Sequence, residues 1–75
     1  MKLLSEYFSD DLNFEAKIYQ VTKIPDNADY KTEFRIIAKN DMGTSFSISF
    51  MDRPIEEVEA YAEDFVNQNQ GKKDD

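Results

Sequence analysis

The stretch EFRIIAKNDMGTSFSISF, residues 33–50, decides the fold of this 75-residue chain. Residues 45–50 alternate strictly between serine and an apolar side chain, and residues 33–39 alternate with one exception, Ile37. A period of two is typical of a β-strand that has one face covered and the other exposed to water. The intervening NDMG supplies turn residues, because Gly43 can adopt the left-handed conformation that tight turns require. The sequence therefore predicts an antiparallel hairpin.

The residues before this hairpin predict a further strand and a helix. FEAKIYQVTKI, residues 14–24, is rich in β-branched and aromatic residues, which favours a strand, and its change of apolar phase suggests a bulge near Tyr19. Apolar residues recur every four positions from Leu4 to Leu12. This spacing predicts a short amphipathic helix over residues 2–11.

A second helix is predicted from Pro54 to about residue 70. Proline is tolerated in the first turn of a helix, where its missing N–H would have no partner, and Asp52 is expected near the cap. Gly71 is a suitable stop. The apolar stripe of this helix consists of Ile55, Val58, Ala62, Phe65 and Val66.

We therefore expect one α+β domain over residues 1–70, followed by a flexible tail over residues 71–75. Its predicted order is α-β-β-β-α, with a three-stranded antiparallel meander and both helices packed on one face. This element order resembles that of the double-stranded RNA-binding domain. That family has basic residues at the start of its last helix, where this chain reads DRPIEE, residues 52–57. RNA binding, which the resemblance implies, is therefore not expected here.

The composition excludes most catalytic chemistry. The chain has no histidine and no cysteine, so the common nucleophile–base pairs, transition-metal sites and disulfides cannot be assembled. Two glycines are too few for a phosphate-binding loop. We expect no enzyme activity, no metal and no cofactor. No apolar run approaches the ~18 residues of a membrane span, which predicts a soluble cytoplasmic protein without a membrane partner.

Negative charge is concentrated in the second half of the chain. The net charge is −7, and residues 40–70 hold seven acidic residues against one basic residue, Arg53. Like charges three or four positions apart on a helix repel by about 0.2–0.5 kcal/mol per pair. Such a set is either a solvated face that keeps the protein soluble or a surface that a cationic partner neutralises. The candidate acidic site consists of Glu56, Glu57, Glu59, Glu63 and Asp64 of the second predicted helix, with Asp10 and Asp11 of the first.

A row of carboxylates along a helix can imitate the phosphates of a nucleic acid. The sequence therefore predicts a small non-catalytic inhibitor or masking factor that engages a basic, nucleic-acid-binding protein. By analogy at the level of class alone, such compact acidic proteins are often carried by phages and mobile elements, which would place this one in a host cytoplasm. Direct binding to nucleic acid is not expected.

The exposed face of the predicted sheet offers an alternative site. One alternative function is a homodimeric accessory or adaptor subunit that uses this face or an edge strand. Another is weak binding of single-stranded nucleic acid by aromatic and basic side chains. The net charge of −7 disfavours this function, because it repels phosphates. The residues of this alternative site are Lys17, Tyr19, Arg35, Ile37 and Lys39.

Overall fold

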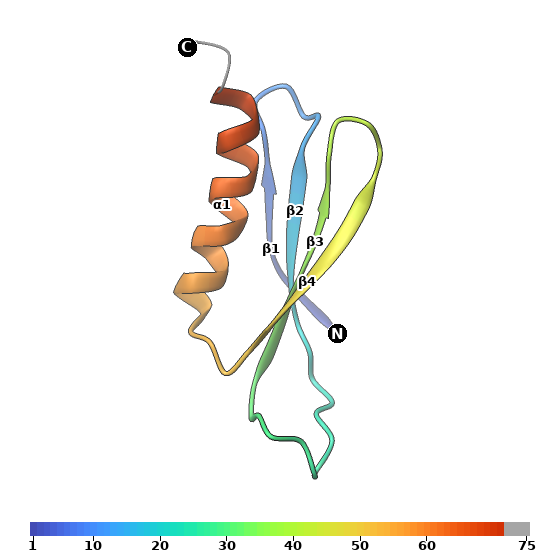
Figure 1. Cartoon of the computed structure of the whole chain (residues 1–75), viewed down its shortest axis with the longest axis vertical. Helices are drawn as coiled ribbons and strands as arrows, with labels where there is room; N and C mark the ends of the chain where they lie inside the picture. Colours follow the sequence, from blue (N-terminus) through green and yellow to red (C-terminus); the bar gives the residue numbers. More distant parts are fainter. Residues whose placement is uncertain (72–75) are drawn as a thin grey trace.

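The computed structural model describes the backbone of residues 1–71 and the side chains of residues 1–67. This part of the chain forms one antiparallel sheet of four strands and one helix that runs along one face of the sheet (Figure 1). The predicted α+β class is confirmed, whereas the predicted three strands and two helices are wrong. The elements are β1 (Lys2–Phe8), β2 (Glu15–Gln20), β3 (Glu33–Lys39), β4 (Ser45–Met51) and α1 (Ile55–Gly71).

The core lies between α1 and the face of the sheet that the helix covers. The strands follow the order β1-β2-β3-β4, and their register aligns Ile18, Ile36 and Ile48 in one row of the covered face. Ile18 and Ile36 are fully buried, but Ile48 on β4 is only partly buried. The reason is that α1 packs mainly on β2, with β3 and β1 beside it. The helix therefore leaves β4 incompletely covered.

The predicted hairpin over residues 33–50 is confirmed. Every residue of β3 lies opposite a residue of β4 in a regular antiparallel register. In the connecting turn, the Asn40 side-chain oxygen accepts the backbone N–H groups of Met42 and Thr44, both at 3.0 Å. Gly43 has a φ of +84°, the left-handed conformation that the turn requires.

The predicted helix over residues 2–11 is wrong, because its first part forms β1 and pairs antiparallel with β2. The spacing of Leu4, Phe8 and Leu12 fits a helix, but Phe8 is exposed and Leu12 lies in the following turn with a φ of +63°. As a strand, the segment satisfies backbone groups along β2 that a helix packed on the sheet would leave unpaired. The resulting order, β-β-β-β-α, also differs from that of the double-stranded RNA-binding domain.

The irregularity of the sheet lies in β1, not in β2. The register of β1 against β2 shifts between Leu3 and Ser5, which marks a bulge opposite Tyr19, whereas β2 pairs regularly with β3 throughout. The bulge predicted near Tyr19 is therefore assigned to the wrong strand. The change of apolar phase reflects use of both faces of β2, with Ile18 beneath the helix and Tyr19 on the opposite face.

The predicted C-terminal helix is confirmed as α1. Asp52 does not cap it, because its Oδ1 accepts the backbone N–H groups of Lys31 (2.8 Å) and Thr32 (3.2 Å). Asp52, which directly follows β4, instead fixes the end of the connection between β2 and β3. Among the described side chains of α1, those of Val58, Ala62 and Val66 are buried.

The predicted flexible tail falls largely on residues 72–75, which lie outside the residues that the structure describes. Over residues 1–71, no helix combines the length and the apolar composition needed to cross a membrane.

Candidate protein-binding surfaces

Three carboxylates of α1 form a row that we call the acidic ridge: Glu56, Glu59 and Glu63. Their spacing of three and four residues brings them to the same side of the helix. Glu56 and Glu63 are exposed and Glu59 is half-buried. Among the residues with described side chains, no lysine or arginine lies within ion-pair distance of the three.

The acidic ridge lies on the side of α1 that faces β1. Burial raises the pKa of the Tyr7 hydroxyl above its ordinary value, and the negative charges of Glu59 and Glu63 raise it further. Tyr61 and Phe65, on the other side of α1, meet the rings of β4. Glu59 and Glu63 therefore point toward Tyr7, which stands on the covered face of β1 opposite Ala16. The ridge therefore produces a negative potential along the β1 side of the molecule.

The other two candidate acids of α1 lie away from the ridge. Glu57 and Asp64 are seven positions apart on a more outward side of the helix, and both are exposed. The Arg53 guanidinium lies 3.0 Å from a Glu57 carboxylate oxygen, in an i,i+4 pair. Glu57 therefore has a cationic partner within the chain, which the absence of basic residues inside the helix did not suggest.

Asp10 and Asp11 were predicted to lie on a helix, but they lie in the turn between β1 and β2. The Asp11 carboxylate accepts bonds from the Ser9 hydroxyl (2.6 Å), the Asn13 backbone N–H (3.1 Å) and the Asn13 amide (3.2 Å). The bond from Ser9, with those from Asn13, holds the pKa of Asp11 below its ordinary value. Asp11 therefore has a structural role in the turn.

This turn lies near the C-terminal half of α1 (Figure 1). Phe14, which follows it, meets Phe65 edge-to-face with ring centroids 5.9 Å apart. The structure thus brings Asp10 to the same end of the molecule as Glu63 and Asp64, although the seven predicted acidic residues do not form one continuous surface.

The five residues of the alternative site share the face of the sheet that α1 does not cover, which we call the open face. The register places Lys17 opposite Ile37, Tyr19 opposite Arg35, and Lys39 opposite Glu15. The three β3 residues of this set, Arg35, Ile37 and Lys39, lie opposite Ser49, Ser47 and Ser45 of β4, which continue the same rows on that face.

Each basic side chain of the open face has an acidic neighbour. Lys17 lies 4.0 Å from Glu15 and is opposite Glu6, and Arg35 lies 3.0 Å from Glu33. Glu33 is buried, and its carboxylate adds to the effect of burial in raising the pKa of the Tyr30 hydroxyl. The open face is therefore close to electrically neutral.

Sequence reasoning missed the contribution of β1 to the open face. Leu3 lies opposite Tyr19 and Phe8 opposite Glu15, and both apolar side chains are 46% exposed. The helical spacing of this segment assigns them to the core instead. The open face thus has more apolar area than the predicted set of five residues indicated.

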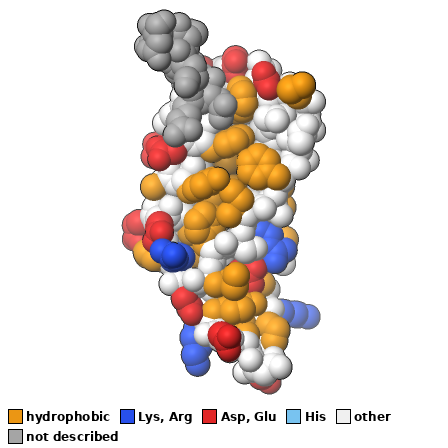
Figure 2. All heavy atoms as spheres, in the orientation of Figure 1, with side chains coloured by type: hydrophobic (Ala, Val, Ile, Leu, Met, Phe, Trp, Pro, Cys, Tyr) orange, Lys and Arg blue, Asp and Glu red, His pale blue; other side chains and the backbone are white. Residues whose placement is uncertain are grey.

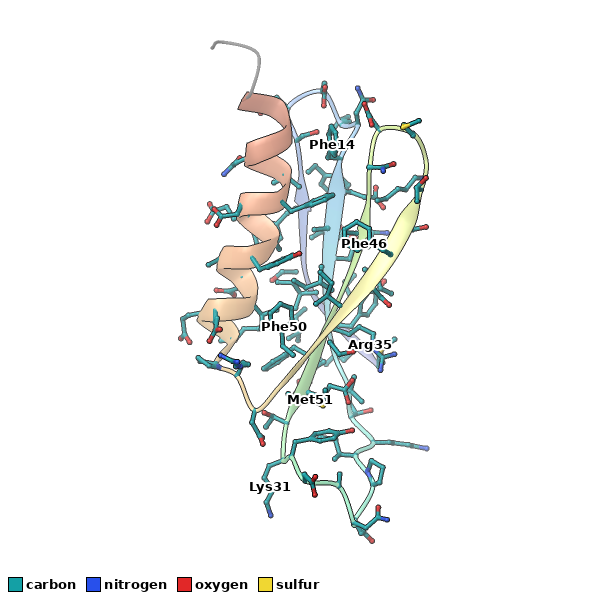
Figure 3. The ribbon with its side chains drawn as sticks, in the orientation of Figure 1. Phe14, Lys31, Arg35, Phe46, Phe50 and Met51 are labelled. Atoms are coloured by element: carbon teal, nitrogen blue, oxygen red, sulfur yellow. The ribbon has the colours of Figure 1, made fainter. Side chains whose placement is uncertain are left out.

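A further exposed apolar surface lies on the covered side, between α1 and β4, where Figure 2 shows a stripe of hydrophobic side chains. The ring of Phe46 lies 5.7 Å from that of Phe65, and the ring of Phe50 lies 5.6 Å from that of Tyr61, both edge-to-face. Phe46 and Phe50 extend from β4 toward the helix (Figure 3). Even so, Phe46 is 39% and Tyr61 41% exposed. We call these four residues the aromatic stripe.

No family model, curated protein or solved structure matches the chain. Within the described residues, no group of three or more acidic side chains is placed to hold a metal ion.

Proposed function

We propose that this chain is a non-catalytic binding protein whose acidic ridge engages a basic surface of another protein, as an inhibitor or a masking factor. The observation that carries the proposal is the arrangement of Glu56, Glu59 and Glu63, three carboxylates in a row on one side of α1 with no cationic group in reach among the described side chains.

The ridge has a cost to the isolated protein that a cationic partner would reverse. Neighbouring carboxylates at this spacing repel by about 0.2–0.5 kcal/mol per pair in water. Glu59 is in addition half-buried against the covered side, where screening by solvent is weaker. A partner that brings lysine or arginine side chains to the ridge turns this repulsion into attraction.

The dimensions of the ridge suit a surface that normally binds phosphates. Successive carboxylates are about 5–6 Å apart at the Cβ atoms, and the row extends over about 10 Å of helix axis. A protein that binds a nucleic-acid backbone presents several basic side chains in a line. Such proteins are therefore the class of partner that the ridge fits.

The alternative of nucleic-acid binding by the open face has less support. Phosphate binding requires an excess of positive charge. Lys17, Arg35 and Lys39 each have a carboxylate next to or opposite them, so the face offers no such excess.

The test compares two triple variants that change the net charge equally. Glu56→Gln, Glu59→Gln and Glu63→Gln remove the ridge with little change of shape. The matched control, Asp26→Asn, Asp29→Asn and Asp41→Asn, removes three charges from loops. Both variants and the wild type would be immobilised to capture proteins from host lysate, and affinities would then be measured with each captured protein purified.

The proposal predicts that the ridge variant loses the partner by at least about tenfold in Kd, while the loop variant retains it. Wild-type binding should also weaken as salt is raised, because exposed charges are screened over about 8–10 Å. If both triple variants bind alike, net charge alone decides and the ridge is not the site.

A further inference from the structure

The outer edge of β4 lacks the features that normally keep another strand away. Residues 42–51 are the longest stretch of the chain without a charged side chain, in a protein whose net charge is −7. The strand has no proline and no glycine, and it pairs with β3 without a bulge. Natural edge strands are usually protected by charges, proline, bulges or a covering segment. This edge has none of the first three, and α1 lies over β2.

The hydrogen bonds at the two ends of the hairpin show which backbone groups of β4 point outward. The Asn40 N–H donates to the Thr44 carbonyl (3.0 Å), and the Asp52 N–H donates to the Thr32 carbonyl (2.9 Å). Both pairs continue the β3–β4 register, in which bonded and non-bonded pairs alternate. Even-numbered residues of β4 therefore bond to β3. The residues whose N–H and C=O groups point away from the sheet are Ser45, Ser47, Ser49 and Met51.

The sequence of β4 is complementary to itself in the antiparallel direction. We propose that β4 pairs with β4 of a second copy of this chain about a two-fold axis at Ile48, which joins the two four-stranded sheets into one continuous sheet. Ser47 then lies opposite Ser49 of the second copy, and Ser45 opposite Met51. These are the residues whose backbone groups point outward, so each pair can exchange two hydrogen bonds.

The apolar side chains also match in this register. Phe46 lies opposite Phe50 of the second copy, and Ile48 lies opposite its own counterpart, in the non-bonded pairs where side chains approach most closely. The partly exposed aromatic stripes of the two copies then adjoin. A shift by one residue would place every serine opposite an apolar residue and mix the two faces. A shift by two residues would keep the faces but leave the ends of β4 (Ser45–Met51) without a partner, so the register centred on Ile48 is the one that pairs the whole strand.

Charge and space favour a second copy as the occupant. Two chains of net charge −7 repel, but they can approach at an edge without charged side chains, while the acidic ridges remain on the β1 sides. Because α1 covers β2 mainly, a second sheet can align with β4 without displacing the helix (Figure 1).

The first test measures association and its footprint together. Sedimentation equilibrium of the wild-type chain should show a monomer–dimer equilibrium with a Kd between about 1 μM and 1 mM. This dimer should strengthen with salt, because salt screens the repulsion between the copies. Amide hydrogen exchange should slow with protein concentration at Ser47 and Ser49. The amide of Ile48, already bonded to β3, should change little.

The second test uses variants at two exposed serines of β4. Ser47→Pro removes an outward N–H without removing a β3–β4 bond, and should weaken the dimer at least about tenfold. Ser47→Glu with Ser49→Glu opposes like charges across the axis and should do the same. Ser47→Lys with Ser49→Glu opposes unlike charges and should restore the dimer. The two double variants share Glu at position 49, next to Arg35, and circular dichroism would confirm that all three variants are folded.

A wild-type chain that is monomeric up to about 1 mM overturns the proposal, and an edge reserved for a strand of another protein would give this result. A dimer without slowed exchange at Ser47 and Ser49, or one equally stable in both double variants, also overturns it. The outcome is independent of the acidic ridge, whose binding should weaken with salt, whereas the dimer should strengthen.

Discussion

The two outer strands of the sheet differ in nearly every property that controls association. β1 has a bulge between Leu3 and Ser5, charged side chains at Lys2 and Glu6, and the acidic ridge beside it. β4 is regular and uncharged, and its apolar side chains are only partly covered. The comparison indicates that one edge of this small sheet is protected against pairing and the other is not. A short chain can in this way separate a charged surface from an edge that is open to pairing.

The acidic ridge and the β4 edge together have a geometric consequence. Pairing through β4 leaves both acidic ridges on the outer sides of the joined sheet. With α1 over β2 in each copy and strands about 4.8 Å apart, the two helix axes would be separated by about 24 Å. A dimer would thus present two negative surfaces, and a partner with two basic patches would gain avidity from it.

The largest expected effect is a loss of folding stability, and it differs between two isoleucines of the same cross-strand row. Ile36→Ala removes a fully buried side chain beneath α1 and should lower the free energy of unfolding by about 2–5 kcal/mol, comparable to the whole stability expected of so small a core. Ile48→Ala, near the β4 edge, should cost about half as much, because its site is only partly covered. Urea denaturation of both would measure the difference. Equal losses would show that α1 covers β4 as well as it covers β3.

A smaller effect is expected on self-association when a single charge is introduced at one or the other edge of the sheet. Ser47→Lys on β4 should weaken self-association about tenfold and raise the concentration at which the heated protein aggregates. Leu3→Lys adds the same charge to β1 and should leave the dimer unchanged. Neither should alter the free energy of unfolding by more than about 0.5 kcal/mol, since both side chains are exposed. Light scattering and sedimentation of the pair test the assignment of the edge, which fails if Leu3→Lys has the larger effect.

The sequence predicted the strand β4 far better than the strand β1, for a physical reason. The strict alternation of residues 45–50 and the turn chemistry before them admit one structure, so the hairpin and its two faces were predicted correctly. Residues 2–8 carry apolar side chains on both faces of a bulged strand, and the bulge between Leu3 and Ser5 hides the period of two. Their pairing with β2 is a tertiary effect, which local spacing does not report.

The arrangement of the candidate site residues was predictable only where all of them lie on one helix or strand. The acidic ridge follows from helical spacing within α1 and was found. Asp11 was misplaced because its role depends on the turn around Ser9, and the exposed apolar residues of β1 were missed with the strand itself. The neutrality of the open face depends on cross-strand neighbours such as Glu6 and Lys17, which become visible only with the register.

A third prediction concerns alkaline pH and the β1 side alone. The pKa of Tyr7 is raised in the folded protein, so its contribution to stability is complete below the unfolded pKa of about 10 and is lost as pH rises through the folded pKa. Glu59→Gln with Glu63→Gln should lower this pKa by removing two of its causes. Tyrosinate absorbance, with Tyr7→Phe as the reference that identifies the Tyr7 transition, measures the change. An unaltered titration would show that the ridge does not face β1.

The smallest expected effect separates the two hairpin turns by their response to acid. The β1–β2 turn is held by the carboxylate of Asp11, whereas the β3–β4 turn is held by the neutral amide of Asn40. Because the folded pKa of Asp11 is depressed, its stabilisation is present above the unfolded value of about 3.9 and is lost as pH falls through the folded pKa. Asp11→Asn should therefore lower the Tm at neutral pH and converge with the wild type in acid. Asn40→Ala should lower the Tm by a similar amount at both pH values, since no titrating group is removed. Thermal melts across the acid range decide between them. If Asp11→Asn does not converge with the wild type in acid, the Asp11 charge does not hold the β1–β2 turn. If Asn40→Ala converges as well, the response to acid is not specific to that turn.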